Sequence, residues 1–367
     1  MSALSEAQIQ IADSKMKKNI SLTDLEWAQK IRDQIPAGTV WTSSVDIPAF
    51  NDLHTIFSNH YDPEKRVLEK VHYVHKENMD SGRNAFEVVS HLWKHEQPQG
   101  SLIVMHGLFE HMHLYQHLIA HGLKHNLSAA GFDLPGHGLS SGRRASIHSF
   151  KEYNVLFETW LEKTPTSVKE ALPKPWFFLG QSTGCALGIK YLLKNNNQSN
   201  NCEPTFKEVF FLAPLVRPLN YQKISWLYTL INRFVNQITR DYPQNSQDEK
   251  FNALLKSNDP LQCRYIDAAW VGAMIEYVKG LEIHLPTKNT SLNNSENAIK
   301  TPIHVFQGTH DLTVDGIYNL NILKQLFEAN ILELEGAGHH LANEVLDYRN
   351  QYLEVISKAI QKHVPLP

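Results

Sequence analysis

The chain has 367 residues, of which 42% are hydrophobic and 20% are charged, and its formal net charge is -3. A nearly balanced charge without a long Lys or Arg block gives too weak a field to hold DNA or RNA, so we expect no nucleic-acid partner. The three cysteines, Cys185, Cys202 and Cys263, are widely spaced and form no Cys-x-x-Cys pair. This pattern favours a reducing compartment over a disulfide framework or a zinc ribbon.

The sequence has neither the features of a signal peptide at its start nor those of a membrane span. The first thirty residues mix charged and polar side chains throughout, and no later stretch approaches about 18 uninterrupted apolar residues. We therefore expect a cytoplasmic protein without a signal peptide or a membrane span.

The chain begins with a segment unlike the rest. Residues 1–66 predict a helical and irregular N-terminal extension. From residue 67 the pattern changes to two β-rich runs, Val67–Val74 and Phe86–Trp93, on either side of a polar turn, which predict a hairpin. The core domain is expected to comprise residues 67–213 and 301–367.

Compact apolar runs then recur, mostly separated by stretches long enough for a helix: Ser101–Met105, Leu127–Phe132, Trp176–Leu179, Val209–Ala213, Ile303–Phe306 and Ile331–Leu334. Short buried strands that alternate with helices predict an α/β fold with a mostly parallel sheet covered on both faces. Residues 214–300 are too many for an ordinary crossover, so we predict a helical cap, or lid, inserted before the last strands.

The strongest motif is Gly180–Gly184 (GQSTG), which follows the apolar run Trp176–Leu179 and precedes a small-residue helix start. This context predicts a sharp strand-to-helix turn that strains the backbone of the serine, with glycines where side chains would clash. Ser182 would lie at the N-terminus of a helix, where developing negative charge is stabilised. We predict Ser182 as a nucleophile.

A second copy of the motif is Gly138–Gly142 (GLSSG). It has no apolar strand directly before it and no apolar helix directly after it. We interpret it as a loop and do not expect Ser140 to act as a nucleophile.

A serine hydroxyl needs a histidine to accept its proton and a carboxylate to fix the tautomer of that histidine. In proteins with this turn, the acid and then the base follow the serine along the chain. Asp311 lies just after the run Ile303–Phe306, and His339 follows a glycine-rich turn after the next run. We predict Asp311 as the acid and His339 as the base, with Asp315 and His340 as the alternatives.

Acyl transfer also needs N–H donors that point at the developing oxyanion. One comes from the residue after the nucleophile, here Thr183, and another from a loop after an early strand. Ser101–Met105 followed by His106-Gly107 fits that loop, so Leu108 is the second predicted backbone donor. His106 precedes the serine, and we interpret it as a residue that shapes the loop.

Several segments together resemble a known family: His106–His111, Gly131–Ser140, Gly180–Gly184, Gly308–Asp311 and Glu335–His339. They are similar to the monoacylglycerol lipase and lysophospholipase (serine aminopeptidase-like) branch of the α/β-hydrolases, from about Val67 to the C-terminus. The resemblance implies the α/β-hydrolase fold, a triad of Ser182, Asp311 and His339, and a cap between the sixth and seventh sheet strands.

The sequence departs from this family close to the serine. Gln181 and Thr183 replace the His and Met often seen there, and Cys185 stands where Gly is usual. We expect Cys185 to be a buried small residue rather than a nucleophile. These changes do not affect the predicted catalytic chemistry, but they leave open which substrate within the family this protein cleaves.

The cap contains a strongly apolar stretch in which side chains recur at steps of three and four: Ile224, Leu227, Ile231, Phe234 and Ile238. The spacing predicts one helix, whose apolar face either packs on the domain, lines an acyl tunnel or touches a membrane surface. A second segment, Ala268–Ile275, suits a packed core or a chain-shaped pocket. The candidate substrate-binding residues are Ile224, Leu227, Ile231, Trp270 and Met274.

The chain has 20 histidines, and His113, His117, His121 and His125 fall four apart on one predicted helix. Histidines with this spacing can chelate zinc, but no H-E-x-x-H pattern is present and the stripe offers no convergent third ligand. We interpret the stripe as a solvated helix face and expect no metal or cofactor.

These patterns predict a serine carboxylic ester hydrolase that acts through an acyl-Ser182 intermediate. The expected partner is a lipophilic ester of the lysophospholipid or monoacylglycerol type, with transient, peripheral contact between the cap and a membrane surface. The alternatives are a small-ester esterase or peptidase with the same triad, and a non-catalytic ligand receptor with the hydrolase fold.

Overall fold

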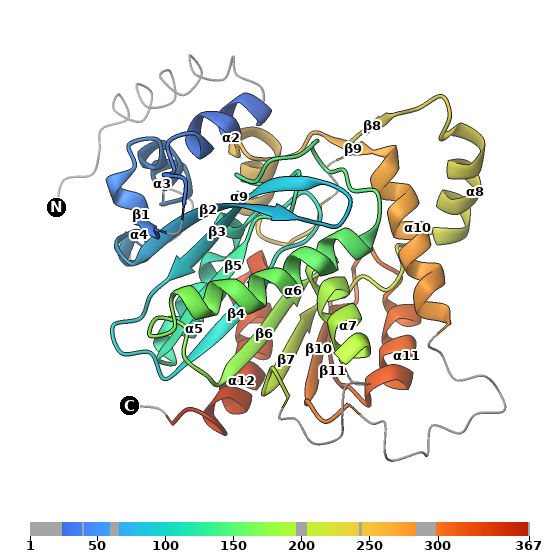
Figure 1. Ribbon diagram of the computed structural model, residues 1–367. Coiled ribbons are helices and arrows are strands. Elements are labelled where there is room, and N and C mark those ends of the chain that lie inside the picture. Colours follow the sequence, from blue (N-terminus) through green and yellow to red (C-terminus); the bar gives the residue numbers. More distant parts are fainter. Residues whose placement is uncertain are drawn as a thin grey trace.

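The computed structural model describes residues 24–38, 40–58, 66–195, 204–241, 244–283 and 299–365. The strands are β1 (Thr42–Ser43), β2 (His72–Asp80), β3 (Ala85–Trp93), β4 (Gly100–Met105), β5 (Leu127–Phe132), β6 (Trp176–Gln181), β7 (Glu208–Leu212), β8 (Gln237–Thr239), β9 (Tyr265–Asp267), β10 (Ile303–Gly308) and β11 (Asn330–Leu334). Within the described ranges, nine of them form one sheet in the order β1-β2-β3-β5-β4-β6-β7-β10-β11 (Figure 1).

The sheet is antiparallel at one edge and parallel elsewhere. β2 pairs antiparallel with β1 and with β3, and β3 pairs antiparallel with β5. All pairs from β5 to β11 are parallel. The fold is the predicted α/β-hydrolase fold, and each predicted apolar run lies in a strand whose bounds differ by at most a few residues.

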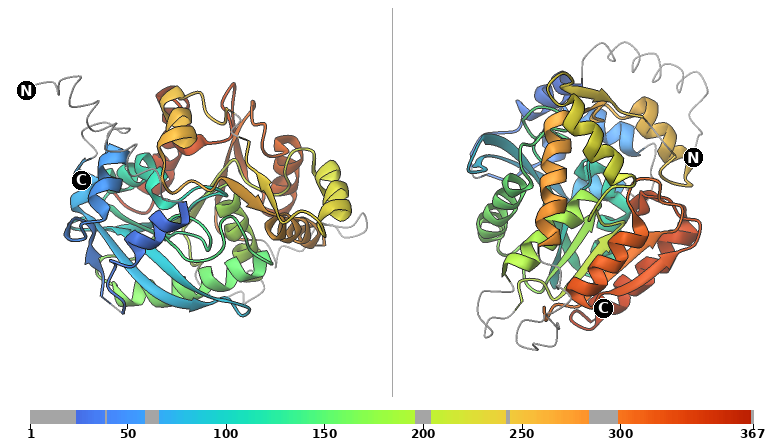
Figure 2. Two further views of the ribbon diagram at one scale, coloured as in Figure 1. Left: turned by 90° about the horizontal axis from the view of Figure 1, so that it is seen from above. Right: turned by 90° about the vertical axis from the view of Figure 1, so that its right-hand side faces the viewer.

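The helical elements of the domain are α5 (Gln116–Lys124), α6 (Phe150–Ser167), α7 (Thr183–Asn195), α11 (Gly316–Phe327) and α12 (Leu346–Gln361), with 3-10 turns η3 (Met112–Tyr115) and η5 (Leu341–Asn343). They lie on both sides of the twisted sheet (Figure 2). Alternate residues of β4 belong to different cores: Ile103 and Met105 face one side, whereas Leu102 and Val104 face the other. A strand buried on both faces has to be apolar throughout, which is why these runs were visible in the sequence.

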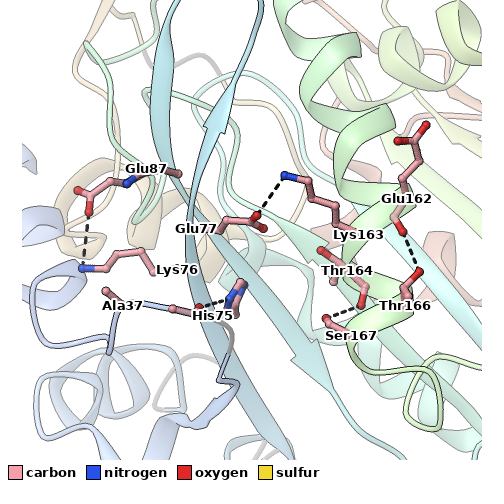
Figure 3. Close-up of a pocket in the computed structure, with 12 residues that line it drawn as sticks. Ala37, His75, Lys76, Glu77, Glu87, Glu162, Lys163, Thr164, Thr166 and Ser167 are labelled. Atoms are coloured by element: carbon pink, nitrogen blue, oxygen red, sulfur yellow. Dashed lines mark hydrogen bonds and ion pairs between the residues drawn. The ribbon is translucent and has the colours of Figure 1, made fainter.

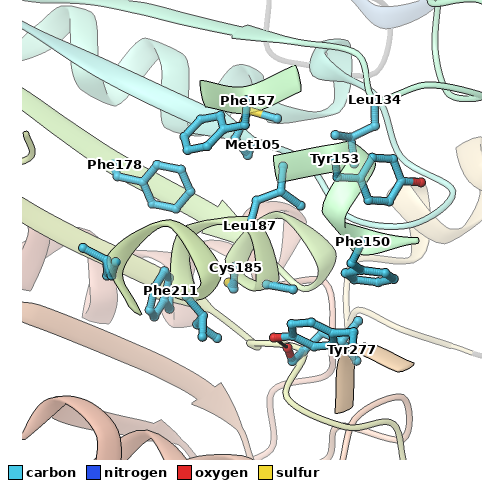
Figure 4. Close-up of a cluster of buried hydrophobic side chains, with 14 of the residues drawn as sticks. Met105, Leu134, Phe150, Tyr153, Phe157, Phe178, Cys185, Leu187, Phe211 and Tyr277 are labelled. Atoms are coloured by element: carbon cyan, nitrogen blue, oxygen red, sulfur yellow. Dashed lines mark hydrogen bonds between the residues drawn. The ribbon is translucent and has the colours of Figure 1, made fainter. Parts of the chain in front are cut away.

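One core lies between the sheet and α6, α7 and α10 (Ala268–Glu282) (Figure 4). Phe157 of α6 packs on Phe178 of β6 with ring centroids 5.6 Å apart. Tyr277 of α10 stacks on Phe150 at 4.7 Å and donates its hydroxyl to the carbonyl of Leu215 at 2.9 Å. The helix α10 of the inserted segment is therefore part of the domain core.

The N-terminal segment packs against the opposite face of the sheet. It contains α2 (Asp24–Arg32), β1, the 3-10 turn η1 (Ser44–Asp46), α3 (Phe50–Ser58) and α4 (Arg66–Lys70). Trp27, Phe50 and Phe57 belong to the same buried cluster as β4 and α12 residues. The predicted boundary between this N-terminal segment and the core domain, at residue 66, stays a prediction. The predicted strand Val67–Val74 is wrong in its first half, because those residues continue α4 and the strand begins at His72.

The inserted segment contains α8 (Tyr221–Ile231), β8, α9 (Glu249–Ala253), the π-helical turn η4 (Leu254–Asn258), β9 and α10. The predicted single helix through Ile238 is wrong beyond Ile231, because the chain leaves the helix and β8 pairs antiparallel with β9, Ile238 opposite Ile266. α8 lies beside α10 (Figures 1 and 2), where Tyr228 reaches the surface of Gly272. Within the described residues, no helix is both long and apolar enough to cross a bilayer.

Candidate active site

Ser182 lies in the turn between β6 and α7, where the sequence predicted a strained serine. Its φ is +51°, in the left-handed region that L residues other than glycine seldom adopt. Its N–H donates to the carbonyl of Leu212 at 3.0 Å, which anchors the turn to β7. A Cβ on Gly184 would lie 2.1 Å from the carbonyl oxygen of Met105, so the glycine allows α7 to start against β4.

Asp311 lies in the loop after β10 and is held by four donors. Its Oδ2 accepts hydrogen bonds from His339 Nδ1 at 2.7 Å and from Gln307 Nε2 at 2.9 Å. Its Oδ1 accepts from the N–H groups of Thr313 at 2.8 Å and Val314 at 3.0 Å. The carboxylate therefore faces the histidine in a single orientation, and the hydrogen bond leaves Nε2 of His339 as the ring atom able to accept a proton.

Burial and charge act in opposite directions on this pair. Burial alone lowers the pKa of His339, but the carboxylate of Asp311, and more weakly that of Glu110, raise it above the ordinary value. Burial also raises the pKa of Asp311, and the charge and hydrogen bond of His339 more than offset that effect, so the pKa is lowered. An ionised carboxylate beside a histidine of raised basicity is the arrangement that general-base catalysis needs.

The two alternative residues have other partners. Asp315 accepts at the N-terminus of α11 from the Tyr318 N–H at 3.2 Å, and its Oδ2 accepts from Arg217 Nε at 3.0 Å. His340 points its Nε2 toward Glu110 Oε1 at 3.0 Å. Asp315 therefore stabilises a helix start.

Ser182 and His339 line one cavity of about 240 Å³. Leu108 and Thr183, the predicted oxyanion donors, line it as well, and within the described residues neither amide has a hydrogen-bond partner. Most of the wall is apolar. Of the predicted substrate-binding residues, Ile224, Trp270 and Met274 line this cavity, whereas Leu227 and Ile231 do not.

Ser140 and His106 are used structurally. The Ser140 hydroxyl donates to the carbonyl of Asp133 at 2.6 Å and accepts from the Val89 N–H at 2.9 Å. His106 Nε2 accepts from the Leu134 N–H at 2.8 Å, as expected for a residue that shapes a loop. Cys185 is fully buried, as predicted, and burial raises the pKa of its thiol.

Sequence reasoning missed Glu110, which supports the loop that carries Leu108. Its Oε2 accepts from the Gly107 N–H at 2.7 Å and from the hydroxyl of Tyr115. Burial raises its pKa, but the charge and hydrogen bond of His340, with the Tyr115 and Gly107 bonds, bring it down to about 2. The sequence predicts roles for His106 and Leu108 in this loop, but nothing in the residue pattern indicates that Glu110 is buried.

Gln181, noted in the sequence as a departure from the usual His, connects the serine turn to the histidine loop. Its Nε2 donates to the carbonyl of His339 at 2.8 Å, and its Oε1 accepts from the Ala342 N–H at 3.4 Å. A glutamine can do both because its amide has a donor and an acceptor. The substitution therefore fixes the base loop relative to the nucleophile.

Residues 96–345 match the serine aminopeptidase S33 family, which is more than half of the chain. The chain belongs to this family. Phospholipase YtpA from Bacillus subtilis (strain 168) is 24% identical over 264 residues, which cover 69% of this chain and 92% of that protein.

Two solved lipase structures have the same fold. A soluble variant of the monoglyceride lipase of Saccharomyces cerevisiae has a TM-score of 0.65 at 17% identity, covering 80% of this chain and 95% of its own. The monoacylglycerol lipase of Paleococcus ferrophilus has a TM-score of 0.59 at 19% identity, covering 76% and 99%. These findings confirm the fold and the resemblance stated from the motifs.

In this S33 protein, the inserted segment is bonded directly to the loop that carries His339. The N–H of His340 donates to the carbonyl of Asn245 at 2.7 Å. The hydroxyl of Ser246 donates to the carbonyl of Asn343 at 2.8 Å, and the Gln247 N–H donates to Glu344 at 2.9 Å. Residues 245–247 therefore form one hydrogen-bonded unit with the base loop.

A larger hollow of about 730 Å³ lies elsewhere, between β2 and the C-terminal end of α6 (Figure 3). Four of its charged side chains form two pairs: Lys76 with Glu87 at 3.7 Å and Lys163 with Glu77 at 3.3 Å. It contains no strained serine and no acid–base pair, so the smaller cavity is the candidate active site.

The histidine stripe is not one solvated helix face, which corrects the sequence interpretation. His113 lies in η3, His117 and His121 lie in α5, and His125 is the C-cap of α5. His113 is 3% exposed and His125 9%, and burial lowers the pKa of His121 to about 3. The turn η3 precedes α5 and directs His113 into the interior.

Proposed function

We propose that this protein is a serine carboxylic ester hydrolase that cleaves esters of lipophilic acyl groups, of the lysophospholipid or monoacylglycerol type, through an acyl-Ser182 intermediate. The observation that carries the proposal is the strained Ser182 in one mostly apolar cavity with His339, whose Nδ1 is bonded to Asp311 at 2.7 Å. Family membership and the phospholipase relative support it.

The first half of the reaction acylates the serine. His339 Nε2 accepts the Ser182 proton as Oγ attacks the ester carbonyl, and Asp311 stabilises the imidazolium that forms. The oxyanion of the tetrahedral intermediate accepts hydrogen bonds from the N–H groups of Leu108 and Thr183. As the intermediate collapses, His339 returns the proton to the leaving alcohol.

The second half reverses these roles with water. His339 accepts a proton from a water molecule, whose oxygen attacks the acyl carbonyl, and the same two amides stabilise the second oxyanion. The proton then goes back to Ser182 Oγ, and the fatty acid leaves. No step requires a metal or a cofactor.

The wall of the cavity supports a lipophilic acyl group. Ile224, Trp270 and Met274 line it, and Trp270 and Met274 are held in the core by α10. Each methylene that such a wall removes from water contributes about 0.8 kcal/mol. A long acyl chain therefore gains binding energy here that an acetate ester does not.

We also propose that α8 contacts the lipid surface from which the substrate is taken. None of its residues is buried, and three of its large apolar side chains are exposed to solvent: Trp226 to 65%, Leu227 to 42% and Leu230 to 53%. Phe234, just after the helix, is 85% exposed. Exposed aromatic and aliphatic side chains of this kind insert into the interfacial region of a bilayer.

The test is a panel of p-nitrophenyl esters of rising acyl length, run beside lysophosphatidylcholine and monoacylglycerol. Rates that rise with chain length beyond butyrate, together with release of fatty acid from either lipid, are expected. Turnover of acetate and butyrate alone would favour a small-ester esterase. Absence of turnover with retained binding of the lipids would favour a receptor.

A further inference from the structure

A cluster of buried histidines lies away from the catalytic cavity, between α3, η3 and the β2–β3 hairpin. His72 of β2 and His91 of β3 lie diagonally across the hairpin, with His72 Nε2 3.1 Å from His91 Nδ1. His113 of η3 stands nearly perpendicular to both rings, with centroids 5.4 Å and 5.2 Å away. One nitrogen from each ring lies within 4.8 Å of the other two.

The spacing is close to that of imidazole ligands around one ion. Zinc binds imidazole nitrogens at about 2.0–2.1 Å, so two ligand atoms of a tetrahedral site lie about 3.3 Å apart. The nitrogens of His72 and His91, which share a hydrogen bond in this structure, already have nearly this separation at 3.1 Å. Rotation of the His113 ring, with an inward movement of its nitrogen by at most about 1.5 Å, completes a set of three.

His91 has the partner that metal-binding histidines usually have. Its Nε2 donates to the carboxylate of Asp133 at 3.2 Å, and its Nδ1, on the cluster side, accepts a hydrogen bond from His72 Nε2 at 3.1 Å. A metal ion would replace this hydrogen bond, with the proton of His72 on Nδ1 instead of Nε2. A carboxylate on the outer nitrogen orients the ring and increases the basicity of the ligand atom.

His113 is the observation that points to a ligand. It is 3% exposed, and in the described part of the chain neither Nδ1 nor Nε2 has a hydrogen-bond partner. Burying an imidazole without a hydrogen-bond partner destabilises the folded state, so most buried polar side chains in proteins have a partner. The surroundings are aromatic, with Phe57 5.6 Å from His113 and Trp93 4.4 Å from His72 between ring centroids.

We propose that His72, His91 and His113 bind a structural zinc ion, with a water molecule as the fourth ligand. The ion joins the β2–β3 hairpin to η3, which continues directly from the loop that carries Leu108. This site is independent of the proposed hydrolase reaction.

The test measures zinc directly in the full-length protein. The chain is stripped with a chelator, dialysed against micromolar zinc chloride and analysed by inductively coupled plasma mass spectrometry. We expect about one zinc per chain, a higher melting temperature with zinc, and an affinity at least about 100-fold weaker in His113→Asn. A stripped wild-type chain that stays folded and binds no zinc would overturn the site.

The controls separate this site from other histidines and from misfolding. The double variant His121→Asn/His125→Asn removes a neighbouring pair whose rings are 4.4 Å apart and should keep its zinc. His113→Cys supplies a thiolate ligand at the same position and should recover binding, with a sulfur-to-metal band when cobalt replaces zinc. Loss of zinc from the double variant, or equal loss from the Asn and Cys variants of His113 when both stay folded, would place the metal elsewhere.

Discussion

The candidate active site and helix α8 of the cap are built in opposite ways. At the site, Asp311 accepts four hydrogen bonds, and Gln181 fixes the loop that carries His339. On α8 no side chain is buried, and Trp226 and Leu230 face solvent. Proton transfer tolerates little positional error, whereas contact with fluid lipid needs apolar area and no fixed partner. Changes at the site should therefore cost more, and on every substrate, than changes on α8.

The largest effect is expected at the nucleophile. Ser182→Ala should lower turnover by roughly 10³-fold or more, because no other described serine occupies the strained turn. Fluorophosphonate labelling should stop with it. Ser140→Ala is the matched control, and it should lose less than about tenfold because its hydroxyl bonds only to Asp133 and Val89. Labelling that survives Ser182→Ala would refute the assignment.

The next effect concerns the acid. Asp311→Asn should leave the fold intact and lower the rate by roughly 10² to 10⁴-fold, since an amide no longer fixes the productive tautomer of His339. Asp315→Asn should weaken the start of α11 and its pairing with Arg217, which lowers the melting temperature while the rate stays within about tenfold. A larger loss of rate in Asp315→Asn than in Asp311→Asn would assign the role of the catalytic acid to Asp315.

The pH dependence should follow the raised pKa of His339. The ring must be neutral to accept the serine proton, so kcat/KM should fall as the pH drops through a pKa above 6.5, about tenfold per pH unit below it. In Asp311→Asn the residual activity should persist to lower pH, because the charge that raises the pKa has gone. Measured pH profiles that coincide for both proteins would show that Asp311 does not set this pKa.

The smallest effect is expected on α8. Leu230→Asp should leave the melting temperature and the turnover of soluble butyrate esters unchanged, because the side chain is 53% exposed. It should lower the rate on monoacylglycerol in anionic vesicles several-fold, with weaker vesicle cosedimentation. Thr229→Asp, an exposed polar neighbour, is the control for added charge. Equal losses in the two variants would show that charge, and not the apolar surface, matters.

The sequence predicted the strand framework well where burial left a strong pattern. β4 and β5 were found almost to the residue because both of their faces are covered. The triad candidates followed from their order after strand ends. Val67–Val74 failed because a short apolar run fits one turn of helix as well as a strand.

What the sequence could not predict depends on contacts between distant segments. The three-and-four spacing continues past Ile231, but β8 forms because β9, more than twenty residues later, offers a partner strand. Buried Glu110 has His340 as a partner at 3.0 Å, and that residue is 230 residues away in the chain. The approach of His113 to two strand histidines likewise depends on how η3 packs on the hairpin.

The bonds from Asn245, Ser246 and Gln247 to the loop of His339 restrict how the cap can move. This end of the insertion is held in place by hydrogen bonds to the loop that carries His339. A displacement of residues 245–247 that kept these bonds would carry His339 with it and change its distance from Ser182. The bonds of residues 245–247 thus couple the position of this end of the insertion to the position of the catalytic base.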